Sequence, residues 1–174
     1  MRSLPNWLSL FRLLSTPMVA TLLLIDAHGM RFPAAALFIT ASITDYLDGY
    51  LARRWKVVSQ LGVLMDLAAD KILVSTVLIV LTGTGAIYSW VAAIIVGREF
   101  IIASLRSHAA AKGLQIAASS LGKWKTAVTL VALSGMILEV NTVLDLTVLY
   151  AATALTVVSA VEYVASYWRA ELNS

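Results

Sequence analysis

Four aspartates stand at helical spacing in a part of the chain that is otherwise rich in apolar residues. Asp45 and Asp48 are three residues apart, and Asp66 and Asp70 are four residues apart. Residues at these intervals lie on one face of a helix, so each pair faces in one direction. Four carboxylates brought together in an apolar setting must take up protons or be neutralised by cations. Two divalent cations would balance the four charges.

The types of side chain that could bind a metal limit which cations fit the site. The chain has no cysteine, and its two histidines, His28 and His108, lack a partner at the spacing of a zinc site. Carboxylate oxygens are hard ligands that favour Mg²⁺ or Mn²⁺. The alternative is that the acids only pair with Arg53, Arg54 and Lys71, but intramembrane ion pairs rarely require four carboxylates at such spacing. The pattern therefore predicts a site for two divalent cations, Mg²⁺ or Mn²⁺.

Small residues accompany the acids. Gly49 and Ala52 share a helix face with the first pair of aspartates, and Gly62 shares a face with the second pair. Small residues at these positions let two helices approach, or leave room for a bulky ligand against the backbone. Both interpretations stay open for each of the three. Arg53 follows directly and offers a planar fork of donors suited to phosphate.

The elements that position these residues are apolar segments of membrane-spanning length. Of the 174 residues 60% are hydrophobic and only 13% charged, which favours a membrane protein over a soluble domain. Cutting the chain at its polar and glycine-rich breaks leaves six segments, each near the ~20 residues that a helix needs to cross a bilayer. They run over residues 7–26, 33–53, 60–82, 87–108, 121–139 and 143–167. The expected fold is an all-α integral membrane protein, a six-helix transmembrane bundle that forms a single domain over residues 1–174.

The distribution of lysine and arginine predicts the orientation, because these residues are enriched at cytoplasmic ends of membrane spans. With a cytoplasmic N-terminus the outside loops carry only Arg31, and both termini lie inside. The cations then at inside ends and loops are Arg2, Arg53, Arg54, Lys56, Arg106, Lys112, Lys123, Lys125 and Arg169. The aspartates fall at the cytoplasmic ends of the second and third spans. These two spans are joined by a short loop, so we expect them to be antiparallel neighbours whose polar faces meet.

The net charge of +3 does not indicate a nucleic-acid partner. The lysines and arginines lie near the ends of apolar runs, and no basic cluster interleaved with aromatic residues occurs. The partners that we expect are membrane lipids and lipid substrates.

Residues 45–70 read DxxDGxxARx8GxxxDxxxD without a departure, a pattern that resembles the signature of the CDP-alcohol phosphatidyltransferases. The resemblance implies a six-helix membrane enzyme, usually a homodimer, in which Asp45, Asp48 and Asp66 bind metals. It also implies that Asp70 helps to bind metal and is the catalytic base.

The implied reaction is a displacement at phosphorus. An acceptor hydroxyl attacks the β-phosphorus of CDP-diacylglycerol, and CMP leaves. The resemblance places the cytidine nucleotide of this lipid against Gly49, Ala52 and Gly62, with Arg53 on its diphosphate. In a bacterium the protein would be a multi-pass protein of the inner (plasma) membrane, with its active site facing the cytoplasm.

A second group of cations suggests the acceptor. Arg98 and Arg106 are eight residues apart and share a helix face, and Lys123 begins the next segment at the same level. Three converging cations would suit a phosphate on the acceptor. Glu99 points about 100° away from Arg98 around the helix, so their adjacency does not guarantee an ion pair. For Arg106, Lys112 and Lys125 an alternative role as interfacial anchors stays open.

The segments REFIIASLR and GKWKT, with PNWLSLFRLLSTP near the N-terminus, resemble the branch of the family that uses sn-glycerol 3-phosphate. This likeness implies glycerol 3-phosphate as acceptor, with Arg98, Arg106 and Lys123 as ligands of its phosphate. The aspartate motif itself also fits acceptors such as inositol phosphate, serine or phosphatidylglycerol.

Asn6 and Arg12 resemble family positions, but the sequence assigns them no definite role. Tyr163, Tyr167 and Trp168 are placed where aromatic residues line a membrane interface. An ion or proton transporter is the alternative class of function, but it predicts broken helices and repeated halves, and the sequence has neither.

Overall fold

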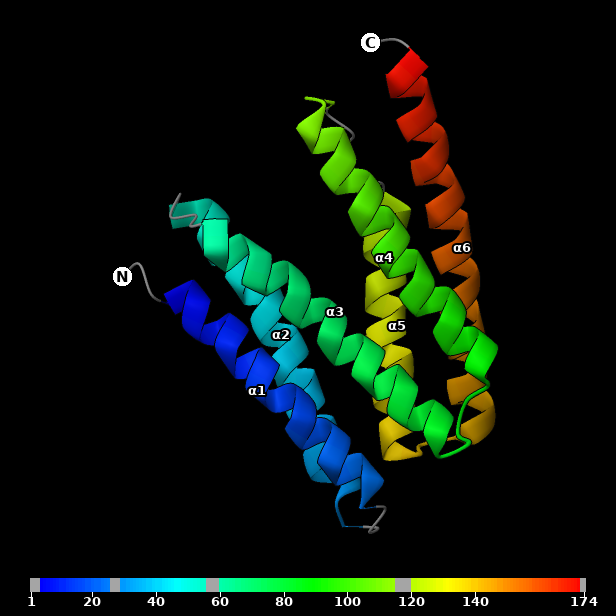
Figure 1. Cartoon of the computed structure of the whole chain (residues 1–174). Coiled ribbons are helices and arrows are strands. Elements are labelled where there is room, and N and C mark those ends of the chain that lie inside the picture. The colour runs from blue at the N-terminus through cyan, green and yellow to red at the C-terminus, as the bar shows by residue number, and fades with distance from the viewer. Residues whose placement is uncertain (1–3, 26–28, 56–59, 115–119, 173–174) are drawn as a thin grey trace.

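The computed structural model describes the backbone of residues 4–25, 29–55, 60–114 and 120–172, and the side chains of 9–25, 29–44, 68–69, 71–114 and 121–172. The described residues form six α-helices and no strand, which confirms the predicted all-α fold (Figure 1). The helices are α1 (Leu4–Leu24), α2 (Arg31–Trp55), α3 (Gln60–Gly83), α4 (Ser89–Ala111), α5 (Ser120–Leu138) and α6 (Thr142–Leu172).

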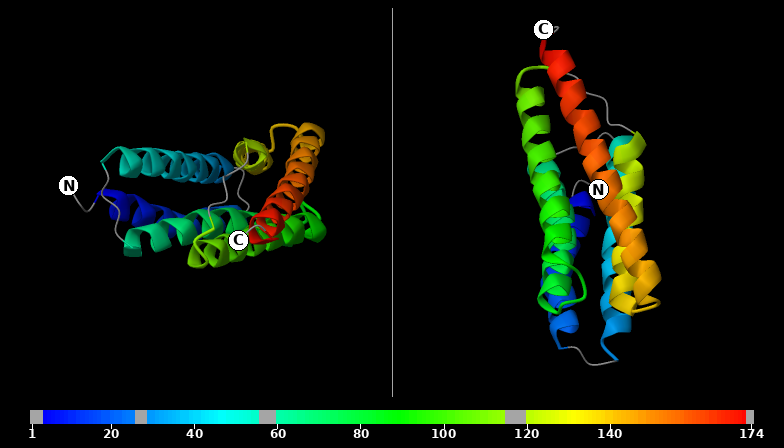
Figure 2. Two further views of the ribbon diagram at one scale, coloured as in Figure 1. Left: turned by 90° about the horizontal axis from the view of Figure 1, so that it is seen from above. Right: turned by 90° about the vertical axis from the view of Figure 1, so that its right-hand side faces the viewer.

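The helices alternate in direction, so the chain begins and ends at the same end of the bundle (Figure 1). Each helix packs mainly against two others, and together the six form a closed ring in the order α1, α2, α5, α6, α4, α3 (Figure 2). We call the end that holds both termini the terminal end. The starts of α1, α3 and α5 and the ends of α2, α4 and α6 lie there.

The ring order differs from the expectation that α2 and α3 pack directly on each other. The helix α1 packs extensively against both, whereas α2 and α3 touch only slightly in the described part of the chain. A short connection brings two helix ends together, but it does not oblige the helices to share an interface. The interior of the ring is therefore bounded by α2 on one side and α3 on the other.

Apolar side chains fill the interior and also cover much of the outside. Val19, Phe38, Leu78, Leu133 and Leu149 are completely or almost completely buried. Large apolar side chains are also exposed on the outer faces of the helices, among them Leu14, Met18, Ile79, Val143 and Val161. By length and composition, α5 over Leu121–Leu138 and α6 over Thr142–Leu172 could cross a membrane. Shorter apolar helices are found at Ser9–Leu24, Arg31–Thr44 and Lys71–Gly83 in the described residues.

The end opposite the termini is held by polar contacts between loops. Arg31, at the start of α2, pairs with Glu139 after α5, with 2.5 Å between the guanidinium and carboxylate. Glu139 has a φ of 51°, the left-handed conformation that often terminates a helix. These contacts agree with the sequence prediction that the two loops lie on one side of the bundle.

The first turn of α6 packs very closely on α5. The carboxylate of Asp145 is buried there and accepts a hydrogen bond from the Asn141 backbone N–H at 3.1 Å. The Asn141 side chain in turn accepts one from the Leu144 N–H, which caps the helix. A Cβ added to Gly135 of α5 would lie 2.3 Å from an Asp145 oxygen. A side chain at position 135 would therefore require the Asp145 carboxylate to move.

We expect Gly135→Ala to destabilise the protein, because the new methyl group must push the capping carboxylate aside. Overpacking of this kind typically costs about 1–3 kcal/mol, which lowers the thermal midpoint by roughly 5 °C. Thermal unfolding in detergent measures the shift. Gly97→Ala is the matched control, because a Cβ at this helical glycine would meet nothing within 4 Å. Equal midpoints for the two variants would contradict the close contact.

Candidate functional site

The aspartate motif is divided between two helices at the terminal end. Asp45 and Asp48 belong to the last part of α2, and Asp66 and Asp70 belong to the first part of α3. The structure thus confirms that the motif is helical and that both halves lie toward one end of the ring (Figure 1). The side chains of the four aspartates, and those of Gly49, Ala52, Arg53 and Gly62, lie outside the described residues. Their assembly into one site stays a prediction.

The donor set suits hard divalent cations. No group of three or more His, Asp or Glu that could hold a metal occurs among the side chains that the structure describes. The four aspartates lie outside that set. Their side chains offer only carboxylate oxygens, and they belong to the end of α2 and the start of α3. Such oxygens fit Mg²⁺ or Mn²⁺.

Arg12 is the charged residue nearest to the motif among the described side chains of α1 and α2. It is fully buried, and its Nε donates a hydrogen bond to the carbonyl oxygen of Ala41 at 3.4 Å. Ala41 lies one helical turn before Asp45, on the same face of α2. Sequence reasoning left Arg12 without a role, and the structure places it directly beside the helix face that carries the first aspartate pair.

A second polar cluster lies inside the ring, where three helices meet. On α4 the side chain of Glu99 accepts hydrogen bonds from Arg98 Nη1, at 3.1 Å, and from Lys125 Nζ of α5. The other guanidinium nitrogen of Arg98, Nη2, donates to the hydroxyl of Ser159 on α6 at 3.0 Å. The cluster therefore joins α4, α5 and α6 through charge-assisted hydrogen bonds, which are stronger than neutral ones.

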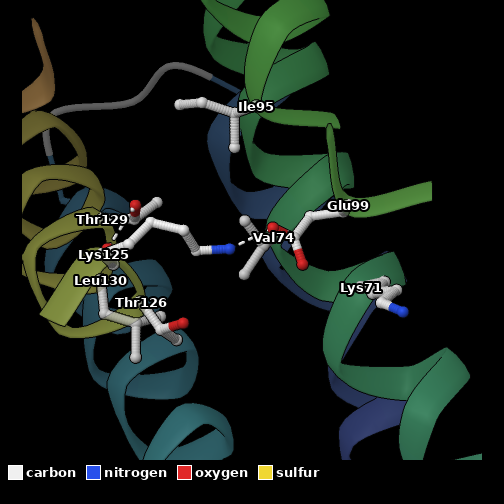
Figure 3. Close-up of a pocket in the computed structure, with 8 residues that line it drawn as sticks. All are labelled: Lys71, Val74, Ile95, Glu99, Lys125, Thr126, Thr129 and Leu130. Carbon is white, nitrogen blue, oxygen red and sulfur yellow. Dashed lines mark hydrogen bonds and ion pairs between the residues drawn. The ribbon is translucent and has the colours of Figure 1, made fainter. Parts of the chain in front are cut away.

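A small pocket opens beside this cluster between α3, α4 and α5. Its cavity of about 30 Å³ has room for one or two water molecules. In Figure 3 the side chain of Lys125 extends from α5 toward Glu99 of α4, with Lys71 on the α3 side. Val74, Ile95, Thr126, Thr129 and Leu130 complete the lining. Lys71 directly follows Asp70, so the pocket lies at the level on α3 where the aspartate motif ends.

The structure brings together only part of the predicted acceptor group. Arg98 faces the interior, as expected, and it does pair with Glu99. Arg106 is exposed, with its guanidinium carbon 5.7 Å from the centre of the Tyr163 ring on α6. Lys123 is also exposed, whereas Lys125 is only 5% exposed and reaches into the pocket. The interpretation of Lys125 as an interfacial anchor is therefore wrong.

The register of α5 explains why Lys125 rather than Lys123 points inward. Lys125 is followed at helical intervals by buried residues, namely Thr129, Ala132, Leu133, Met136 and Ile137. Lys123 lies two residues earlier, about 200° around the helix from Lys125. The buried face of α5 therefore carries Lys125 and not Lys123.

The ends of α4 and α6 are tied together at the terminal end. Lys112 pairs with Glu171, and this hydrogen bond raises the pKa of Lys112 above its ordinary value. The rings of His108 and Tyr167 lie 6.3 Å apart. Tyr163 and Tyr167 are buried against α4, so the expectation of an interface role fits only the exposed Trp168.

Comparison with known sequences identifies the class of protein. The family described as CDP-alcohol phosphatidyltransferase matches residues 2–158. The chain therefore belongs to the CDP-alcohol phosphatidyltransferase family, and it is an enzyme of that family.

Several relatives are similar along nearly the whole chain. The CDP-diacylglycerol–glycerol-3-phosphate 3-phosphatidyltransferase of Haemophilus influenzae is 33% identical over 169 residues, which cover 92% of this chain and 91% of the relative. The enzyme of the same name from Bacillus subtilis is 34% identical, over 98% of this chain and 97% of the relative. A third, from Arabidopsis thaliana, is 30% identical over 98% of this chain and 82% of its own length.

Proposed function

We propose that this protein transfers the phosphatidyl group of CDP-diacylglycerol to sn-glycerol 3-phosphate, which yields phosphatidylglycerophosphate and CMP. The observation that carries the proposal is the likeness to enzymes named for this reaction over almost the full length of the chain. The pocket lined by the buried Lys125 and by Lys71 of α3 supports a place for the acceptor phosphate.

On the donor side, Asp45, Asp48, Asp66 and Asp70 are proposed to hold two divalent cations, Mg²⁺ or Mn²⁺. When bound, such cations supply charge stabilisation for the diphosphate and the departing CMP. The small residues Gly49, Ala52 and Gly62 leave space for the cytidine nucleotide against the helix backbone, and Arg53 donates hydrogen bonds to the diphosphate.

Asp70 is proposed as the general base. It takes the proton of the acceptor hydroxyl while the acceptor oxygen bonds to the β-phosphorus and the bond from that phosphorus to the CMP oxygen breaks. The position of Asp70 supports this role, because its neighbour Lys71 lines the pocket between α3, α4 and α5. The base would then border both the metal site and the acceptor.

For the acceptor phosphate we propose Arg98 and Lys125 as interior ligands. The guanidinium of Arg98 has one further donor, Nε, that is buried and makes no hydrogen bond within the described residues. Buried donors in native proteins are normally satisfied, so an unused one suits a ligand. Arg106 and Lys123 are exposed nearer the terminal end, and their role in binding the acceptor phosphate stays a prediction.

We further propose that the six helices cross a membrane and that the enzyme works as a homodimer in the bacterial inner membrane. The exposed apolar side chains of α1, α3 and α6 would face lipid. Lysine and arginine are concentrated at the terminal end, which favours a cytoplasmic position for that end and for the active site.

An assay with purified protein tests which acceptor the enzyme uses. CDP-diacylglycerol and Mg²⁺ are supplied with glycerol 3-phosphate, inositol phosphate, serine or phosphatidylglycerol in separate reactions, and CMP release is measured. We expect rapid release only with glycerol 3-phosphate. Release with another acceptor alone would keep the family chemistry but refute this acceptor, and no release with any of them would refute both.

A further inference from the structure

The acidic residue Glu99 is unexplained by the proposed chemistry, although it stands among the cations of the acceptor pocket. A carboxylate that only repels the acceptor phosphate would lower the affinity of the site for it. Yet Glu99 is only partly exposed, lines the pocket, and accepts hydrogen bonds from both Arg98 and Lys125. Its position therefore calls for a function of its own.

Lys125 needs a partner to extend into the interior. A lysine side chain has four flexible carbons, and burial without a compensating charge favours either loss of its proton or withdrawal toward water. Lys125 is almost completely buried, and Glu99 accepts a hydrogen bond from its ammonium group across the gap between α5 and α4 (Figure 3). The carboxylate thus holds this side chain extended at the wall of the pocket.

The orientation of Arg98 is fixed in the same way. Its Nη1 donates to Glu99 and its Nη2 donates to Ser159 on α6, so two anchors on different helices hold the planar guanidinium. The third donor, Nε, has no hydrogen-bond partner within the described residues. The trio of Arg98, Lys125 and Glu99 brings two cationic side chains onto one carboxylate.

We infer that Glu99 is a positioning residue for the acceptor: its carboxylate holds Lys125 and Arg98 in the geometry that binds the phosphate of the acceptor. The inference rests on the proposed function. Glu99 acts through the two cations and does not touch the reacting atoms. Its removal therefore weakens acceptor binding more than it changes donor binding or the chemical step.

The experiment measures kcat and both KM values for wild type, Glu99→Gln, Lys125→Gln and the double variant. We expect Glu99→Gln to raise KM for glycerol 3-phosphate about tenfold and to change KM for CDP-diacylglycerol by less than about twofold. That tenfold change corresponds to about 1.4 kcal/mol, within the range of pairwise coupling energies. Because Glu99 acts in part through Lys125, the effect of the double variant should be smaller than the sum of the two single effects. Glu162→Gln, at an exposed carboxylate on α6, is the matched control.

Three results would overturn the inference. An unchanged KM for the acceptor would show that the cations hold their positions without Glu99. A lower KM would show that the carboxylate competes with the phosphate. Strictly additive effects in the double variant would show that Glu99 and Lys125 act independently.

A second variant covers the case in which Glu99→Gln does not fold. Glu99→Asp keeps the negative charge but is one methylene shorter, so it cannot reach both cations. Since the shorter side chain draws the carboxylate back from the two cations, we expect a raised KM for the acceptor here as well, whereas wild-type kinetics would refute a positioning role. Failure of the proposed function is separate, because in that case the wild-type protein itself gives no CMP with glycerol 3-phosphate.

Discussion

Asp70→Asn is expected to slow phosphatidyl transfer by about 10²- to 10⁴-fold, the range that general-base catalysis contributes. The amide has nearly the shape of the carboxylate but cannot take the proton of the acceptor hydroxyl. Three proposed metal ligands remain, so binding of CDP-diacylglycerol should be largely retained. Single-turnover CMP release measures the chemical step, and binding of the donor lipid is measured in the same preparation.

Asp145→Asn is the matched control for this change. It makes the same substitution at a buried carboxylate at the opposite end of the bundle, so transfer per folded molecule should match wild type. Wild-type CMP release from Asp70→Asn would exclude Asp70 as the base. Complete loss of donor binding would instead make Asp70 chiefly a binding residue.

Asp48→Asn is expected to impair metal activation itself. A neutral amide oxygen is a weaker ligand for a hard divalent cation than a carboxylate, and even residues that only support metal ligands typically contribute 10–100-fold to affinity. The Mg²⁺ concentration for half-maximal activity should therefore rise at least about tenfold, with partial recovery of rate at high Mg²⁺. Titration of activity with Mg²⁺ and with Mn²⁺ measures the shift.

The comparison for this variant is Glu162→Gln, which removes an exposed carboxylate from α6 and should leave the metal titration unchanged. If Asp48→Asn follows the wild-type curve for both cations, the ligand assignment on α2 is incorrect. A rise confined to the acceptor KM would point to the acceptor pocket instead.

The helices were predictable from sequence because their boundaries coincide with physical breaks. Apolar runs end at glycine and polar residues such as Gly83, Glu139 and Asn141, and each observed helix overlaps its predicted segment closely. The ring order was not predictable in the same way. Chain connectivity suggested that α2 packs on α3, but α1 packs against both. Which helices share an interface depends on the fit of many side chains.

The sequence alone did not predict which of the proposed acceptor cations face the interior. Lys123 and Lys125 flank one tryptophan and have similar sequence surroundings, so only the register of α5 against its neighbours decides which one faces inward. The inward direction of Arg98 followed from its depth in an apolar segment. Its pairing with Glu99 depends on side-chain torsions that the sequence does not specify. Without this pair no role could be predicted for Glu99.

We expect this protein to join the phosphatidyl group of CDP-diacylglycerol to glycerol 3-phosphate. The most direct test follows isotopically labelled glycerol 3-phosphate into the lipid fraction and counts CMP in the same reaction with Mg²⁺. We predict one labelled phosphatidylglycerophosphate for each CMP, and no product when the cation is chelated. CMP release without label in the lipid, or no CMP from folded protein, would contradict this function.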